Sequence, residues 1–536
     1  MAEAMTSTIE PTPSTGWQPQ PHPPLRPGAL IDPETCGGTI TADVVIIGSG
    51  MGGGALAYAL AGSGLSVLIV ERGDFLPRES ENFDAAQMFL HHRYQTSEAW
   101  IDGHTGTEFQ PGVYHWVGGN TKMYGACLPR FRREDFETFD TADGISPAWP
   151  IRYEDLDPYY TRAEKIFDVH GNAGEDPTEP PHAGPYPHPA HAHEPVIERF
   201  AARLRRQGLQ PFHMPNGMTF TADGDRARAS TDDGTPSGTD AKSDAETRLV
   251  RPALANENVR LLTGTTLTRL TTDPAGEHIT AAHGSRQGRP VTVRGQRFVL
   301  AAGAVNSAVL LLGSATERHP DGLGNSSGLL GRNYMVHNST FVIGLHPLRR
   351  NRTRWQKTLG LNDWYLPTPA HRYPLGNVQM LGKLPGAHLK PARARLPLWF
   401  LDKVAARTVD LYLTTEDLPR QHNRVRLAGG RTVIDWTPTN LRPHQELVEE
   451  VTAAVRGSGY PLVFTERMGI QPNSHMCGTA VAGHDPDGSV LNPDCRSHDL
   501  DNLWIVDGSF FPSSAALNPA LTIAANALRV AERILA

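Results

Sequence analysis

Cysteine is scarce in this chain, its excess of charge is small, and long apolar runs are lacking. Four cysteines are scattered among 536 residues without a CxxC pair or metal-ligand spacing, which excludes a disulfide framework and predicts no metal site and a reducing, cytoplasmic setting. The net charge of −7 provides no basic footprint for nucleic acid. The first residues lack the basic start and apolar core of a signal peptide.

One stretch comes close to the length of a membrane span. Residues 298–316, "FVLAAGAVNSAVLLLGSAT", carry no charge, and a spanning helix needs about 18 apolar residues or more. Gly303 and Asn306 interrupt the stretch, so it divides into a buried strand, a turn and a buried helix. We therefore predict no membrane partner.

The length exceeds what one hydrophobic core supports, which predicts at least two domains. Residues 1–40 are rich in Pro, Ser and Thr and predict a flexible arm. A strand–loop–helix–strand unit is expected over 43–71, and apolar spacing predicts helices over 158–168 and 194–207. The polar stretch 221–247 is typical of a surface insertion.

The second half of the chain contains segments of two kinds, which differ in how their apolar residues are distributed. Apolar alternation predicts strands from Asn258 to Gly303, ending in a strand-to-helix crossover. Residues 336–459 are mixed in polarity and contain several Trp and Tyr, so they predict a separate inserted layer. The chain ends in "LTIAANALRVAERIL", which has the spacing of an amphipathic helix.

A glycine motif stands at the start of the first unit. Gly48, Gly50 and Gly53 form G-x-G-x-x-G between the strand "DVVIIG" and the helix "GALAYALAGSG". Gly48 permits a tight turn, Gly50 lets the backbone approach a pyrophosphate, and Gly53 lets helix and strand pack closely. The second strand ends in Glu71, near the ~20-residue offset of a carboxylate that binds ribose hydroxyls. The motif predicts a dinucleotide site, but it does not distinguish FAD from NAD.

Five segments of the chain have a recognisable pattern: "DVVIIGSGMGGG…VLIVERG", "WVGGNTKMYGACLPRFRREDF", "SPAWPIRYEDLDPYYTRAEKIFDVHG", "RFVLAAGAVNSAVLLLGS…GLGNSSGLLGRNYMVH" and the block from Asn473 to Ala536. Together they resemble the glucose-methanol-choline (GMC) oxidoreductase family, whose members bind FAD and oxidise alcohols, and the block from Asn473 is the most specific of the five. Within that block, "NLWIVDGSFFPSSAALNPALTIAANALR" is similar to the family's closing signature.

The resemblance implies an α/β fold with a Rossmann-like FAD-binding domain and an inserted mixed-sheet substrate domain. We expect the FAD-binding domain to be discontinuous, over residues 41–168, 246–335 and 460–536. Residues 169–245 and 336–459 are then expected to form the substrate-binding domain.

Several residues are implied to contact the cofactor. In the family, the segment matching "VGGNTKMYG" runs along the flavin, where Gly118 and Gly119 let the backbone approach and Asn120 follows. Some relatives attach FAD through a histidine at the position of Met123; a thioether cannot form that bond, so we predict non-covalent FAD. His115 is the nearby histidine that could overturn this prediction.

The closing block supplies the other cofactor contacts. Asp507 and Gly508 in "VDGS" match a family position near the FAD ribityl and diphosphate groups, although Asp-Gly is also a common turn. A helix that begins near Pro519 and includes Thr522 is expected to point its positive end at the pyrimidine edge of the flavin.

The resemblance also assigns the chemistry. His475 in "NSHMCGT" matches the family's base, and histidine suits proton transfer near neutral pH. Asn518 in "LNPALT" matches the partner that donates a hydrogen bond to the developing alkoxide. His475 is thus expected to take the hydroxyl proton while hydride passes from the carbinol carbon to flavin N5.

The substrate is expected to be a small-molecule alcohol of the carbohydrate class. The strand "LYLTTEDLPRQHNRVRL" resembles the family's pocket floor, with Asp410, Glu416, Asp417 and Trp364 around it, although each acid read singly suits a solvated surface. The segment "YHWVGGNTKMYGACLPRFRREDF" is similar to bacterial GMC dehydrogenases of aminoglycoside antibiotic pathways, which oxidise a primary hydroxyl of an amino sugar to an aldehyde.

Such a polycationic substrate predicts carboxylates in the pocket. The alternatives are a neutral-sugar dehydrogenase or oxidase, a non-GMC flavoenzyme that uses NAD(P)H, and a flavin-binding protein without catalysis. The electron acceptor, oxygen or another carrier, stays open.

Overall fold

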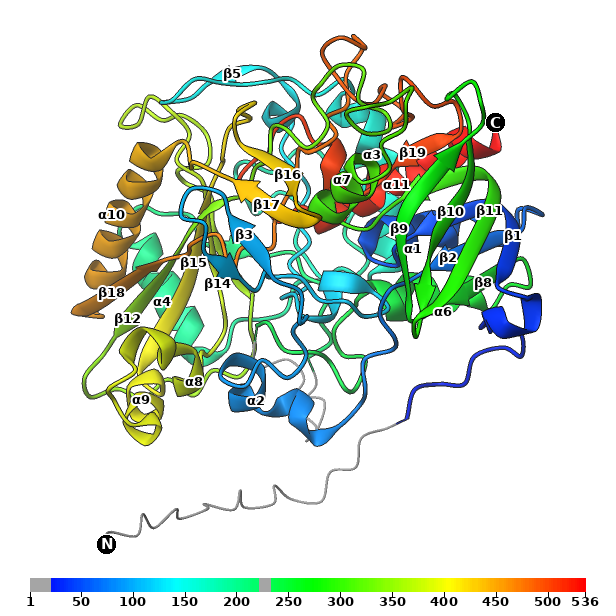
Figure 1. Ribbon diagram of the computed structural model, residues 1–536. Helices are drawn as coiled ribbons and strands as arrows, with labels where there is room; N and C mark the ends of the chain where they lie inside the picture. Colours follow the sequence, from blue (N-terminus) through cyan, green and yellow to red (C-terminus); the bar gives the residue numbers. More distant parts are fainter. Residues whose placement is uncertain (1–20, 221–232) are drawn as a thin grey trace, which may run out of the picture.

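The computed structural model describes residues 21–220 and 233–536, and its strands form four sheets in these ranges. Figure 1 shows the first sheet with helices α1 (Met51–Leu60) and α11 (Ala520–Leu535) on one side of the molecule. The second sheet lies on the other side, beside α10 (Leu441–Gly457).

The first sheet is built around the glycine-motif strand. Its strand order is β8 (Val259–Leu262), β2 (Val67–Val70), β1 (Thr39–Ile47), β11 (Arg289–Leu300), β10 (Ile279–Arg286) and β9 (Thr265–Thr272), and β19 (Leu503–Ile505) also pairs with β11. The strands β8, β2, β1, β11 and β19 are parallel, whereas β10 and β9 are antiparallel. The apolar runs of β1 and β2 are buried, as expected for a parallel sheet covered by helices.

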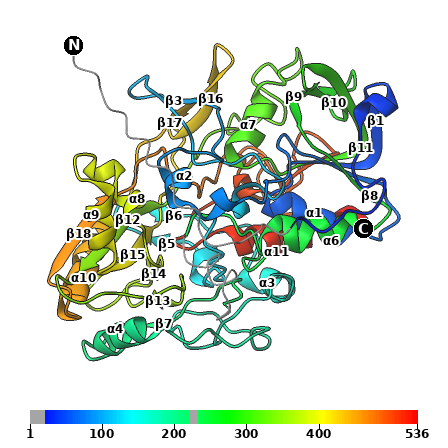
Figure 2. The same cartoon turned by 90° about the horizontal axis from the view of Figure 1, so that it is seen from below.

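Helices cover this sheet in a stack that includes the end of the chain. α1 packs on α11, and α11 packs on α3 (Tyr153–Ile166) (Figure 2). α6 (Arg251–Leu254) lies beside α1, and α7 (Ala304–Leu312) follows β11 as the predicted crossover helix. No helix in the described ranges combines the length and apolar character needed to cross a bilayer.

The second sheet is antiparallel and has two different faces. Its order is β18 (Leu462–Arg467), β12 (Asn338–Leu345), β15 (Thr408–Thr415), β14 (Asn377–Met380), β13 (Leu359–Leu361) and β7 (Phe212–His213). Val342, Val378 and Leu411 pack with α10 and α4 (Pro195–Arg205) in one hydrophobic cluster. Because side chains alternate along a strand, Gln379 and Thr414 lie on the opposite face, where they bond to the closing block of the chain.

The remaining elements are short and connect these two bodies. A third sheet joins β16 (Arg424–Ala428), β17 (Arg431–Asp435), β3 (Trp100–Asp102) and β4 (Glu108–Phe109), and β5 (Phe139–Asp140) pairs with β6 (Ile145–Ser146). The shorter helices are α2 (Ala85–Phe89), α8 (Gly386–Leu389), α9 (Leu398–Ala405), the 3₁₀ turns Pro33–Cys36, Ser80–Phe83, Gly119–Lys122, Glu134–Phe136, Pro391–Arg393 and Gly508–Phe510, and a π-helical turn Glu246–Val250.

Two expected boundaries need correction. The division at residue 460 falls before β18, which pairs with β12 and therefore belongs to the second sheet. Within 336–459, β16 and β17 leave the inserted layer and pair with β3 instead. Pairing partners that lie far apart in sequence decide both points, so local composition could not reveal them.

The flexible arm predicted over residues 1–40 is wrong for its second half. The Leu261 N–H donates to the Ala29 carbonyl and the Ile31 N–H donates to the Leu261 carbonyl, so the chain extends the first sheet beyond its edge strand β8. Arg251 also donates to the Pro23 carbonyl. Backbone pairing at the open edge of the sheet thus orders a segment whose composition predicted no regular structure. Residues 1–20 lie outside the described residues.

The surface insertion predicted over 221–247 is also wrong where it is described. Residues 221–232 lie outside the described residues, but Lys242, Asp244 and Glu246 are buried. These polar side chains can be buried because Asp244 and Glu246 accept from Lys122 and Lys242 donates to the Thr235 carbonyl.

Candidate active site

The glycine loop has an open face at the start of α1. A Cβ on Gly48 would lie 2.4 Å from the Ala301 carbonyl oxygen, and one on Gly53 would lie 2.0 Å from that of Gly48, so both glycines are required by close packing. A Cβ on Gly50, by contrast, would meet no atom within 4 Å. Gly50 caps the helix without a side-chain acceptor, so the first N–H groups of α1 have no side-chain cap.

Glu71 holds this loop through a residue that the motif does not include. Its Oε2 accepts hydrogen bonds from the Ser49 N–H (3.0 Å) and hydroxyl (2.6 Å), and its Oε1 accepts from the Gly73 N–H at 2.9 Å. The Ser49 oxygen in turn accepts from the Gly118 N–H at 3.1 Å. Ser49 therefore links the glycine loop to the second cofactor segment, and sequence reasoning missed it because serine has no fixed role in the motif.

The predicted flavin segment lies against the glycine loop. Gly118 and Gly119 have φ values of +96° and +57°, which favour glycine. A Cβ on Gly119 would lie 3.2 Å from the Gly50 Cα, so the two glycine segments border the same space. The Asn120 side chain accepts from the Tyr114 N–H and donates to the Gly112 carbonyl, which shapes the preceding loop.

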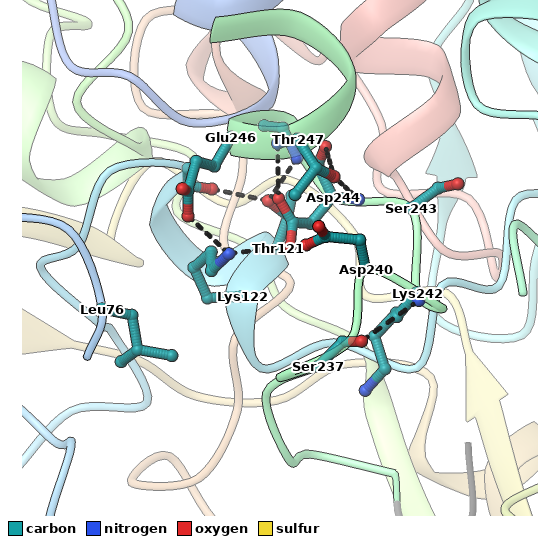
Figure 3. Close-up of polar contacts among 12 residues, drawn as sticks. Leu76, Thr121, Lys122, Ser237, Asp240, Lys242, Ser243, Asp244, Glu246 and Thr247 are labelled. Atoms are coloured by element: carbon teal, nitrogen blue, oxygen red, sulfur yellow. Dashed lines mark hydrogen bonds and ion pairs between the residues drawn. The ribbon is translucent and has the colours of Figure 1, made fainter. Parts of the chain in front are cut away.

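A buried charge cluster around Lys122 holds the segment that contains Gly118 and Gly119 in place (Figure 3). The Lys122 ammonium donates to Asp244 at 2.9 Å and to Glu246 at 2.6 Å, and Arg251 donates to Glu246 at 2.8 Å. Burial by itself would lower the pKa of Lys122, but the two carboxylates raise it overall. Thr121 accepts from the Ala245 N–H, which ties the same two segments together a second time.

Met123 and His115 bear on the mode of FAD attachment. Met123 is buried in an apolar cluster with Leu76 and Tyr94. The His115 Nε2 atom lies 3.6 Å from the Glu98 carboxylate, and burial, together with Arg72, lowers the pKa of His115 to about 4 despite that carboxylate. That FAD is bound without a covalent bond stays a prediction.

The closing block packs directly on the glycine loop. A Cβ on Gly52 would lie 2.1 Å from the Val506 carbonyl oxygen. The next residue, Asp507, accepts from the Gly303 N–H and the Ser307 hydroxyl with one carboxylate oxygen and from the Ser509 N–H with the other. Burial raises the pKa of Asp507. Asp507 therefore shapes the loop beside the site, and its contact with the cofactor stays a prediction.

Gly508, Pro519 and Thr522 occupy different surroundings. The Gly508 carbonyl accepts from the Gly478 N–H, which joins the two segments that carry the chemistry. α11 begins after Pro519, as expected, and Pro519 offers no side-chain cap to the helix N–H groups. Thr522 is buried, and its hydroxyl pairs with the Tyr160 hydroxyl at 2.8 Å, so this side chain joins α11 to α3.

The hydrogen bonds of His475 define its free nitrogen. Its Nδ1 lies 3.0 Å from the His337 Nδ1, and the His337 Nε2 lies 3.2 Å from the Ser514 carbonyl. Burial lowers the pKa of His337 to about 4, so this ring is neutral near pH 7. A carbonyl only accepts, so His337 carries its proton on Nε2 and accepts on Nδ1. His475 must therefore donate from Nδ1, which leaves a lone pair on Nε2.

Electrostatics keep His475 neutral as well. Burial, with His337 and Lys357 nearby, lowers the pKa of His475 well below its ordinary value of 6.5. The residue is nevertheless only half-buried, so it keeps some access from outside the protein interior. A neutral imidazole with an unprotonated Nε2 is the form that can accept a proton.

Asn518 is joined to the same region through the second sheet. Its Oδ1 accepts a hydrogen bond of 2.9 Å from Gln379, whose own oxygen accepts from Lys357 at 2.9 Å. Lys357 thus neighbours His475 electrostatically and bonds to the glutamine that holds Asn518. The fold therefore brings the two predicted catalytic residues around one buried lysine.

The expected pocket acids are not solvated. Asp410 accepts from Lys383, Glu416 from the Ser146 hydroxyl and Asp417 from Trp436, and all three acids are buried. Burial raises the pKa of Glu416 to about 8 and that of Asp417 to about 6. The interpretation that each of these acids lies on a solvated surface is therefore wrong. Because each of these acids is buried and bonds to a protein partner through at least one oxygen, they do not provide the carboxylate lining expected for a polycation.

Trp364 likewise packs in the hydrophobic cluster below α10 and not in an open pocket. Together, the open Gly50 face, the uncapped helix start and the glycine pair opposite form a cradle that fits a dinucleotide diphosphate. His475 and Asn518, whose side chains suit alcohol chemistry, both have Lys357 in their surroundings, His475 through its charge and Asn518 through Gln379. The site defines a dinucleotide-dependent oxidoreductase.

Comparison with known proteins identifies the family. The chain matches the GMC oxidoreductase family over residues 114–339 and 419–527, and a Rossmann-like NAD(P)-binding domain over residues 46–87. The chain therefore belongs to the GMC oxidoreductases, and FAD is its cofactor.

Relatives match along nearly the full length. The chain is 31% identical to paromamine 6'-oxidase of Streptomyces fradiae, over 97% of this chain and 95% of the relative. It is also 31% identical to 6'''-hydroxyparomomycin C oxidase of Streptomyces lividus, over 92% and 91%. The fructose dehydrogenase large subunit of Gluconobacter japonicus is 27% identical, over 93% and 98%.

Solved structures confirm the fold. A pyridoxine 4-oxidase from Mesorbium loti superimposes with a TM-score of 0.62 at 18% identity, covering 92% of this chain and 98% of that one. A formate oxidase from Aspergillus oryzae RIB40 gives 0.64 at 15% identity, with the same coverage. The α/β fold with a Rossmann-like FAD-binding body is thus confirmed.

Proposed function

We propose that this protein oxidises a primary hydroxyl of an aminoglycoside-type amino sugar to an aldehyde in antibiotic biosynthesis. Two relatives that align along almost the whole chain are named as oxidases of paromamine and of a hydroxyparomomycin, which supports this substrate class. A neutral sugar is the second candidate, because the fructose dehydrogenase large subunit aligns over a similar length at lower identity.

The orientation of His475 carries the proposed mechanism. Its Nε2 lone pair accepts the proton of the substrate hydroxyl, while its Nδ1–H stays bonded to His337. Asn518 donates from Nδ2 to the substrate oxygen, because its Oδ1 is already bonded to Gln379. Bound FAD supplies the two-electron acceptor for the hydride that leaves the carbinol carbon.

The domain organisation proposed for this reaction follows the corrected boundaries. Residues 29–168, 246–335 and 468–536 hold FAD, whereas 169–245 and 336–467 read the substrate, with β16 and β17 bridging the two. FAD is held without a covalent bond, since Met123 cannot form one. Acid precipitation should therefore release all of the flavin into the supernatant, and flavin that stays with the precipitate would point to His115.

The test is anaerobic bleaching of the bound flavin. Paromamine-type amino sugars should reduce the flavin absorbance faster than fructose or glucose at equal concentration. Faster bleaching by a neutral sugar would select the second candidate. Bleaching by NADPH but by no alcohol would indicate a different flavoenzyme class, and no bleaching by any of them would indicate a flavin-binding protein without this activity. His475→Ala should keep FAD and lose most of the rate, and an unchanged rate would remove His475 from its role.

A further inference from the structure

A chain of buried amides runs through the second sheet between two charged groups. The Asp176 carboxylate accepts from the Asn362 amide at 2.6 Å, and the Asn362 oxygen accepts from Asn377 at 2.8 Å. The Asn377 oxygen accepts from Gln379 at 3.0 Å, and the Gln379 oxygen accepts from the Lys357 ammonium at 2.9 Å. All five side chains are buried, so water cannot replace a missing partner.

Lys357 and Asp176, the two ends of this chain, determine the donor-to-acceptor direction of every hydrogen bond between them. An ammonium has donors only, and an ionised carboxylate has acceptors only. Lys357 forms an ion pair with Asp233, and Asp176 forms one with Arg132, so each end is charged. Each amide must therefore turn its oxygen toward Lys357 and its NH₂ group toward Asp176. Reversing one amide would place two donors or two acceptors face to face in a buried site, where neither group could find another partner.

Asn518 branches from this chain at Gln379. The Gln379 NH₂ group has two hydrogens, and they go to Asn377 and to Asn518 Oδ1 at 2.9 Å. Asn518 must therefore offer its oxygen to Gln379. Its own NH₂ group has no hydrogen-bond partner in residues 21–220 and 233–536, and the side chain is only half-buried.

We propose that Gln379 and Lys357 are positioning residues that hold the Asn518 amide with its NH₂ group toward the substrate oxygen. This inference rests on the proposed alcohol oxidation. A correctly turned Asn518 donates to an oxygen that gains negative charge as its proton leaves. A reversed Asn518 would aim its carbonyl oxygen at that charge. The chain from Asp176 to Lys357 thus sets the polarity of a catalytic group that neither end touches.

Gln379→Glu tests the proposal because it reverses the polarity at one point. The new carboxylate still pairs with Lys357, but it can donate neither to Asn518 nor to Asn377. Asn518 must then turn its NH₂ group toward residue 379 and its oxygen toward the substrate. The rate of anaerobic flavin reduction should fall about 10²-fold, the scale for loss of one oxyanion donor, with little change in the alcohol concentration that gives half the maximal rate.

A double-mutant comparison separates this role from a structural one. Asn518→Ala should lower the rate by a similar factor, and adding Gln379→Glu to Asn518→Ala should lower it no further. Gln445→Glu, the same change on the exposed face of α10, should keep the wild-type rate. FAD absorbance and the melting temperature report whether each variant is folded and loaded.

The possible outcomes are distinct. A wild-type rate in Gln379→Glu, or a loss of the same size with and without Asn518, overturns the positioning role while the oxidation itself stands. A wild-type rate in Asn518→Ala removes Asn518 from the reaction and overturns the inference with it. Failure of the proposed function shows earlier, as a wild-type flavin that no alcohol bleaches.

Discussion

Two glycines that lie two residues apart, Gly50 and Gly52, should fail in opposite ways when each gains a methyl group. Gly50 has a φ of −67°, which alanine adopts easily, and a Cβ there meets no protein atom within 4 Å. The same Cβ on Gly52 would lie 2.1 Å from the Val506 carbonyl oxygen. Gly50→Ala should therefore harm the cofactor site, whereas Gly52→Ala should harm the packing between α1 and the closing block.

The magnitudes follow from these contacts. The methyl of Gly50→Ala occupies the space where a diphosphate would approach the first N–H groups of α1. Loss of one charge-assisted hydrogen bond costs about 1.5–3 kcal/mol, which weakens FAD binding roughly 10- to 150-fold. In Gly52→Ala a backbone oxygen must move, and overpacking of this kind costs about 1–3 kcal/mol of folding stability.

Two assays on the FAD-free protein separate the effects. Titration with FAD measures the dissociation constant, and urea unfolding without FAD measures stability. Gly50→Ala should bind FAD more weakly and unfold at the wild-type urea concentration, whereas Gly52→Ala should unfold earlier. Wild-type FAD affinity in Gly50→Ala would refute the assignment of this face to the cofactor. Wild-type stability in Gly52→Ala would refute the close packing of Val506 on α1.

Three further predictions concern the buried titratable groups, two through substitutions and one through the pH dependence of flavin reduction. Lys122→Met leaves two buried carboxylates with one cation, Arg251, so urea unfolding should show a loss of about 3–5 kcal/mol; a loss below about 1 kcal/mol would contradict the cluster's role. The pKa of Glu416 rises from 4.5 to about 8 on folding because of burial, so the unfolded chain releases this proton first and stability falls from pH 4.5 to 8. Glu416→Gln should flatten the melting temperature across that range, and an unchanged slope would argue against a buried neutral acid. Because the pKa of His475 lies well below 6.5, flavin reduction should be flat through neutral pH and fall only in acid; an acid limb centred at pH 6.5 or above would contradict a neutral base.

Local sequence patterns predict much of the cofactor site. The strand, glycine turn and helix at residues 43–60 depend on neighbours a few positions apart, so their spacing predicts both the elements and the open Gly50 face. The same holds for α3 and α11, whose apolar residues repeat with the period of a helix. Resemblance of the closing block then pointed to His475 and Asn518, although it did not say which atoms would be free.

Burial of polar groups could not be predicted in this way. The segment 233–247 and the acids Asp410, Glu416 and Asp417 look solvated in sequence because their partners are remote; Lys122 lies 122 residues from Asp244. Likewise, β18 pairs with β12 across more than a hundred residues of chain. A polar side chain is stable in the protein interior only when it has a hydrogen-bond or ionic partner there. When that partner is remote in sequence, local composition does not reveal it.

The sequence alone therefore determined what chemistry the chain can carry: a dinucleotide turn, an imidazole and an amide. The tertiary structure decided how each group is presented. It placed Ser49 between Glu71 and Gly118, put the proton of His475 on Nδ1 through His337, and turned Asn518 through Gln379, which lies 139 residues away. Hydrogen-bond direction depends on what each partner can donate or accept, and only folding brings those partners together.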